Sequence, residues 1–106
     1  MDSLRQNQLR QLLALTEGIL QDAKQKEWES MMEKEQARRT LMEEFFQQES
    51  TIQETVQIEE VARQIMSLDK KIIAMAEAGK LEILKKMRNL SAGQNAVDAY
   101  TANSSR

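Results

Sequence analysis

The sequence contains no cysteine and no histidine among its 106 residues. Their absence excludes thiol nucleophiles, imidazole bases, disulfide bonds and the usual zinc and copper sites. No Glu-x-x-His motif of the kind that builds di-iron bundles is present. The three glycines are isolated, so there is no glycine-rich loop to cradle a phosphate. We therefore expect a protein that is not an enzyme and that uses no metal ion or cofactor.

Proline is also absent, and only four residues are aromatic: Trp28, Phe45, Phe46 and Tyr100. Glu, Gln, Lys, Arg, Leu, Met and Ala, the residues with high helix propensity, dominate the sequence. This composition predicts an all-α fold with long helices. The scarcity of aromatic side chains predicts a thin core.

Long apolar runs are missing as well. The longest is IIAMA at residues 72–76, far too short to span a bilayer, and the N-terminal segment lacks the apolar region of a signal peptide. The net charge of −2 offers no general attraction to nucleic acid. We expect a cytoplasmic protein without stable membrane insertion and without direct nucleic-acid binding.

Apolar residues at three- and four-residue steps predict a first amphipathic helix over about residues 4–24, with Ser3 and Gln6 forming a capping box at its start. The apolar phase then slips at about residues 24–27, which indicates a corner. A second helix over about residues 28–47 begins at Trp28. We interpret Trp28 as a structural anchor of this hairpin; the alternative is a hot spot for a partner.

The middle of the second helix is polar where leucine would be expected, at Glu35, Arg38 and Arg39. These residues form either a solvated face or a charged layer at the edge of the helix interface that fixes register.

Thr51 and Glu54 predict a second capping box, followed by a third helix over about residues 52–90. Its apolar residues from Ile58 to Gly79 follow a coiled-coil-like seam, which slips by four residues and restarts at Ile83. The predicted architecture is an antiparallel helical hairpin plus a long third helix, an elongated three-helix bundle over residues 1–90. Residues 91–106 are predicted to form a flexible or weakly helical C-terminal tail.

Two helices of about 20 residues cannot cover a helix of nearly 40, so part of the third helix should expose apolar surface, which usually serves association. Residues 80–90 are also basic. Either these cations interact favourably with the macrodipole at the C-terminal half of the helix, or this end docks a partner. The candidate partner-binding residues are Ile72, Ile73, Met75, Ile83, Met87, Leu90 and Tyr100.

Several segments together resemble the FliT family of flagellar export chaperones. They are the corner KQKEW, the following EKEQARR, SLDKKI in the long helix and AVDAY near the end of the chain, in an order and spacing that span about residues 9–100. The resemblance implies a cytoplasmic helical protein that binds the C-terminal region of the filament cap protein and keeps it ready for export.

The resemblance further implies contacts with the export ATPase and the export gate and, in some members, with the flagellar master transcription regulator. It implies that Tyr100 docks to the gate and that the C-terminal segment restrains client binding. Three alternatives remain at this point: a structural coiled-coil protein that self-associates, a sister chaperone for hook–filament junction proteins, and a basic amphipathic module at a membrane surface.

Overall fold

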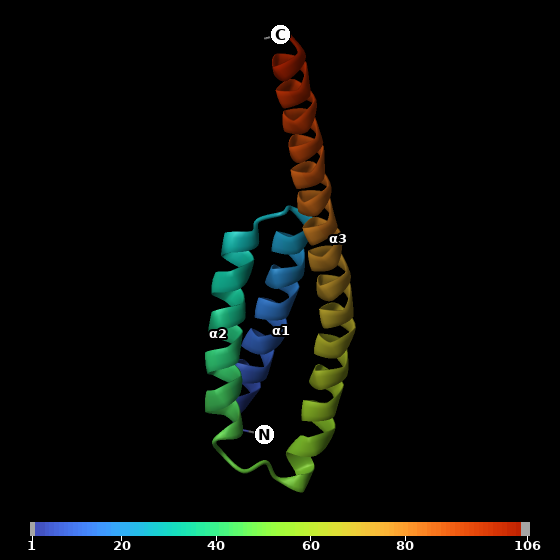
Figure 1. Cartoon of the computed structure of the whole chain (residues 1–106). Coiled ribbons are helices and arrows are strands. Elements are labelled where there is room, and N and C mark those ends of the chain that lie inside the picture. The colour runs from blue at the N-terminus through green and yellow to red at the C-terminus, as the bar shows by residue number, and fades with distance from the viewer. Residues whose placement is uncertain (1, 105–106) are drawn as a thin grey trace. The chain divides into compact units, whose positions relative to one another are not determined.

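A computed structural model describes residues 2–104 of the chain, with side chains as far as residue 90 (Figure 1). It contains three helices: α1 (Ser3–Lys24), α2 (Trp28–Phe46) and α3 (Ile52–Ser104). No strand occurs in this part of the chain. The all-α prediction, with a hairpin and a long third helix, is confirmed.

The chain divides into two units, one that ends at Met75 and one that begins at Ala76. In the first, α2 runs back alongside α1, and the first half of α3 packs against this hairpin (Figure 1). The second contains the remainder of α3, which continues without a break beyond residue 90, where the sequence analysis ended the third helix. The segment lacks proline, and a lone Gly93 weakens a helix by only about 1 kcal/mol. The division into bundle and tail at residue 90 stays a prediction.

The start of α1 corrects one detail of the sequence analysis. Asp2, not Ser3, caps the helix: its carboxylate Oδ1 accepts a hydrogen bond of 3.1 Å from the backbone N–H of Leu4. Ser3 is the first residue inside the helix. An aspartate satisfies the free N–H groups of a first turn as well as a serine does, and its charge also suits the helix macrodipole.

The corner between α1 and α2 is a Schellman motif. The N–H of Glu27 donates to the carbonyl of Asp22 at 2.8 Å, and that of Lys26 donates to the carbonyl of Ala23 at 3.2 Å. Lys26 has a φ of 60°, the left-handed conformation that glycine usually adopts at this position. The predicted corner is therefore confirmed, although no glycine marks it in the sequence.

Asp22 also fastens the corner through its side chain. Its Oδ2 accepts hydrogen bonds from Ser30 Oγ at 2.9 Å and from Lys34 Nζ at 2.8 Å, both on α2. The Lys34 ammonium, helped by the Ser30 hydroxyl, lowers the pKa of Asp22 against the opposing effect of burial. Gly18 makes room for this contact, since a Cβ placed there would lie 3.3 Å from Lys34 Cδ.

The core of the first unit consists of two small apolar clusters. The first has four buried residues: Leu9, Leu12, Phe45 and Ile65. The second has three: Ile19, Leu20 and Ile72. Each cluster joins α1 to α3, and Phe45 and the half-buried Met31 add contacts from α2. These few buried side chains form the thin core that the sequence predicted.

A polar layer connects the three helices through Thr16 of α1, Arg38 of α2 and Asp69 of α3. Thr16 lies between the core residues Leu12 and Ile19 in the sequence. Arg38 Nη1 donates to the Thr16 hydroxyl at 3.2 Å and to Asp69 Oδ1 at 2.6 Å. Thr16 in turn donates to the carbonyl of Leu12 at 2.8 Å. Of the two interpretations of the polar stretch in the second helix, the charged layer holds for Arg38, whereas Arg39 is exposed.

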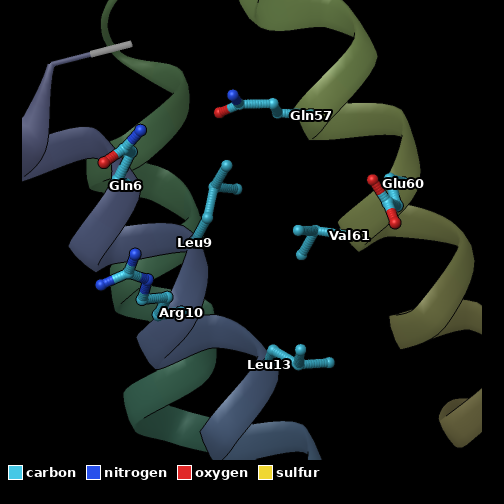
Figure 2. A pocket seen from close by; sticks show the side chains of 7 residues that line it. All are labelled: Gln6, Leu9, Arg10, Leu13, Gln57, Glu60 and Val61. Atoms are coloured by element: carbon cyan, nitrogen blue, oxygen red, sulfur yellow. The ribbon is translucent and has the colours of Figure 1, made fainter.

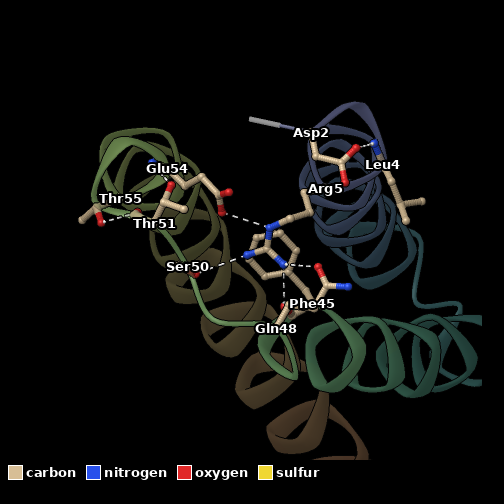
Figure 3. A network of polar contacts seen from close by, with 9 residues as sticks. All are labelled: Asp2, Leu4, Arg5, Phe45, Gln48, Ser50, Thr51, Glu54 and Thr55. Carbon is tan, nitrogen blue, oxygen red and sulfur yellow. Dashed lines mark hydrogen bonds and ion pairs between the residues drawn. The ribbon is translucent and has the colours of Figure 1, made fainter.

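A second polar cluster ties the start of α1 to the α2–α3 turn (Figure 3). Arg5 is buried, and its Nε donates to Glu54 Oε2 at 2.9 Å. Thr51 Oγ1 accepts from the N–H of Glu54 at 3.3 Å, which is half of the predicted capping box. The carboxylate of Glu54 is directed to Arg5, so the other half of the box is replaced by a tie between helices.

Candidate functional site

The predicted partner-binding residues fall into two groups. Ile72 is 5% exposed and belongs to the second core cluster, against which the half-buried Met75 packs. These two side chains are engaged in holding α3 to the hairpin. Ile73, the neighbour of Ile72, is 57% exposed because adjacent residues of a helix point about 100° apart.

The other predicted residues with described side chains are exposed. Ile83, Met87 and Leu90 show 51%, 59% and 74% of their surface, and Leu81 and Leu84 are exposed as well. We call these five residues the α3 stripe. Five large apolar side chains exposed within ten residues form a patch of the kind that usually marks an interaction site.

Two of the singled-out residues need separate mention. The side chain of Tyr100 lies outside the described residues, so its role in docking stays a prediction. Trp28 is the first residue of α2, is half-buried and belongs to neither core cluster. Its role as a hairpin anchor likewise stays a prediction.

An apolar groove between α2 and α3 was not predicted from the sequence. It has a volume of about 200 Å³. We call it the α2–α3 groove; its lining residues are Leu9, Leu12, Met42, Phe46, Ile58, Val61, Ala62, Ile65, Met66 and Asp69. Phe46 of α2 is 61% exposed and Met66 of α3 is 62% exposed, so each of these helices presents one large apolar side chain to solvent.

The signal for this groove was the pair Phe45-Phe46. Two adjacent helical residues cannot both face the same core. Phe45 is fully buried, and Phe46 packs edge to face on it with ring centroids 5.1 Å apart. Of the two, only Phe45 belongs to the core.

A second groove lies between α1 and α3, where Leu9 and Leu13 face Val61 across the gap (Figure 2). Its volume is about 360 Å³. Polar side chains form much of its wall: Gln6, Arg10, Gln57 and Glu60. Such a lining is less suited to an apolar partner helix than the α2–α3 groove.

Among the residues whose side chains are described, no group of three or more histidine, cysteine or carboxylate side chains could hold a metal ion. No helix in the described part of the chain has an apolar stretch long enough to cross a bilayer. The functional features that stand out are the α3 stripe and the α2–α3 groove.

Comparison with known proteins gives one match. A family model described as "Flagellar protein FliT" matches residues 6–102, nearly the whole chain. No curated protein and no solved structure matches the chain.

Proposed function

The chain belongs to the FliT family of flagellar proteins, which are export chaperones, and we propose that its client is the C-terminal region of the filament cap protein. In this proposal the protein binds the cap protein in the cytoplasm, prevents its premature assembly and delivers it to the export ATPase and the export gate. The family is a chaperone family rather than an enzyme family.

The observation that carries the proposal is the exposure of the α3 stripe. Ile83, Met87 and Leu90 follow one another at four- and three-residue steps, so they lie on one side of the helix. Each exposes at least half of its surface to water. An amphipathic client helix laid along this side would remove that apolar area from water, which is the main driving force for association.

The α2–α3 groove provides an independent apolar surface in the first unit. Phe46 and Met66 are exposed beside it, and Met42 is half-buried in its wall. Methionine adapts its shape to different partners, and a phenylalanine adds a large contact area. We propose that this groove also accepts an apolar segment of a client, and that Ile73 extends the contact surface of the same unit.

Self-association through the heptad-like seam is the main alternative. The seam residues Ile65 and Ile72 are buried in the core of the first unit, and Ile58, Val61 and Leu68 pack against the same clusters. They are therefore not free to form a coiled coil with a second chain. Sedimentation would detect a homo-oligomer that forms through the α3 stripe.

Two further roles belong to the proposal through family membership. Tyr100 is proposed to dock to the export gate, and the protein is proposed to bind the flagellar master transcription regulator. The second role would act through protein contact and not through DNA, since the chain is acidic overall.

The test is a titration of a labelled peptide, the C-terminal segment of the cap protein, with the full-length chain. Met87→Ser should weaken binding at least tenfold, because an apolar contact at the centre of the stripe is lost. Ile52→Ser is the matched control: Ile52 is also on α3 and 91% exposed but belongs to neither surface. Phe46→Ser tests the groove separately.

Equal affinities of wild type, Met87→Ser and Phe46→Ser for the cap peptide would overturn the proposal that the α3 stripe and the α2–α3 groove bind the client. Tighter binding of a hook–filament junction peptide than of the cap peptide would mean that the client is a junction protein and not the cap protein. Tyr100→Ala should weaken binding of the isolated gate protein and leave cap-peptide binding unchanged; loss of both would show a structural role for Tyr100.

A further inference from the structure

The charges of the chain are unevenly distributed. Residues 1–75 hold fourteen acidic and ten basic side chains, whereas residues 76–90 hold four basic and two acidic ones. The four cations are Lys80, Lys85, Lys86 and Arg88, and all are exposed. Residues 76–90, which contain the α3 stripe, thus carry a net positive charge within a protein that is acidic overall.

The cations also have a regular position relative to the apolar side chains. Lys86 precedes Leu90 by four residues and lies about 40° around the helix from it, at one edge of the stripe; Arg88 follows Leu84 by four and lies between Leu84 and Leu81, in the other half of the stripe. The two cations therefore lie on opposite sides of Met87. A partner helix laid over the stripe would meet a cation on each side of Met87, and charges beside an apolar seam help to select charged partners in coiled coils.

We propose that the α3 stripe selects an acidic amphipathic helix: a segment whose apolar seam covers Ile83, Met87 and Leu90 and whose flanking positions carry Asp or Glu opposite Lys86 and Arg88. This inference rests on the proposed chaperone function and names the chemistry of the client segment. Complementary charges at the rim of an interface raise the association rate and reject partners of the wrong sign.

An anionic membrane surface fits the same segment less well. Helices that lie in a membrane interface use tryptophan, phenylalanine and leucine on the apolar face, and residues 76–90 contain no aromatic side chain. Lys80 projects on the apolar side itself, four residues before Leu84, and not on the polar face. Glu77 and Glu82 place negative charge on the same segment.

The experiment uses three synthetic helical peptides with an identical leucine seam and with Glu, Gln or Lys at the flanking positions. Each is titrated with the full-length chain by fluorescence anisotropy at low and at high salt. An exposed ion pair changes an equilibrium constant by a factor of about 1.5 to 5, so several together should make the Glu peptide bind about tenfold more tightly than the Gln peptide at low salt. High salt should reduce that difference.

The variant Lys86→Glu/Arg88→Glu should reverse the order, so that the Lys peptide binds best. Lys70→Glu/Lys71→Glu is the matched control, because it makes the same charge change at exposed positions of α3 in the first unit. This control should leave the order of the three peptides unchanged. Circular dichroism of each variant checks that helix content is retained.

Equal binding of the three peptides, with the cap peptide still bound, would overturn the charge selection and leave the proposed function standing. Failure of every peptide, the cap peptide included, would overturn both. Tighter binding to vesicles of anionic lipid than to the Glu peptide, lost in Lys86→Glu/Arg88→Glu, would assign the cations to a membrane and overturn the proposal.

Discussion

Replacing Arg5 should destabilise the protein more than replacing other charged residues of α1. The Arg5 side chain is 5% exposed and meets groups from α2, the α2–α3 turn and α3. Besides Glu54, its guanidinium donates to the carbonyl of Phe45 at 3.0 Å and to Ser50 Oγ at 3.2 Å. It also lies 4.1 Å from the centre of the Phe45 ring, within cation–π distance.

The size of the effect follows from what Arg5→Met leaves behind. Methionine fills part of the space but gives Glu54 no partner, and the carboxylate of Glu54 is itself only 11% exposed. Breaking a buried ion pair on one side costs about 3–5 kcal/mol. Domains have a total stability of about 5–15 kcal/mol, so the variant should lose about a fifth of it or more.

The assay is urea unfolding followed by circular dichroism. For a slope of about 2 kcal/mol per molar urea, the midpoint should fall by about 2 M. The double variant Arg5→Met/Glu54→Leu removes the stranded carboxylate as well and should regain most of the loss, since apolar replacements of a buried pair are often neutral. Arg10→Met, at an exposed position of α1, should change stability by no more than about 0.5 kcal/mol.

A loss below about 1 kcal/mol for Arg5→Met would refute this reasoning. So would a double variant no more stable than the single one. Either result would mean that Glu54 reaches water when Arg5 is absent, and that the tie between the start of α1 and the start of α3 contributes little.

Two further predictions concern the corner between α1 and α2. Because the pKa of Asp22 lies below its ordinary value of 3.8, the folded state holds its proton less tightly than the unfolded state. The contribution of Asp22 is therefore complete above that ordinary value and is lost as pH falls through the folded pKa. Asp22→Asn should give a smaller decrease in urea midpoint between pH 7 and pH 3 than wild type, and an unchanged decrease would contradict the link to Lys34. Lys26→Gly should raise the stability by about 1 kcal/mol, because glycine adopts a φ of 60° without the steric penalty; thermal unfolding measures this, and a lower melting temperature would show that the Lys26 side chain stabilises the corner.

The sequence predicted the helices and the corner because both depend on local pattern. Apolar spacing gives the face of each helix that packs, and the phase slip near Lys24 shows where that face changes direction. The Schellman motif itself was not predictable, since its left-handed position holds Lys26 and not glycine. The hydrogen bonds from the N–H groups of Lys26 and Glu27 stabilise that conformation, and they depend on how the chain turns after Ala23.

The candidate site was only partly predictable, because periodicity gives a face but not the length over which a neighbour covers it. At about 1.5 Å per residue, α1 and α2 are about 33 and 29 Å long, close to the 36 Å of residues 52–75. Ile72 belongs to this part of α3 and is buried in the core of the first unit, whereas Ile83 belongs to the second unit and is exposed, although both fit an apolar seam. The α2–α3 groove depends on which of two adjacent phenylalanines turns inward, which tertiary packing decides.

The charges beside the α3 stripe also disfavour self-association of the chain through this exposed apolar surface. In a two-fold symmetric dimer the same patch of each copy faces the other. Lys86 and Arg88 of one copy would then face cations of the second, and like charges at an interface are unfavourable. A client helix with acidic flanks avoids this repulsion and gains attraction at the same positions. Lys86 and Arg88, which disfavour a second copy, would therefore favour the client, so replacing both with glutamine should weaken binding of the Glu-flanked peptide and, in sedimentation, favour self-association of the chain.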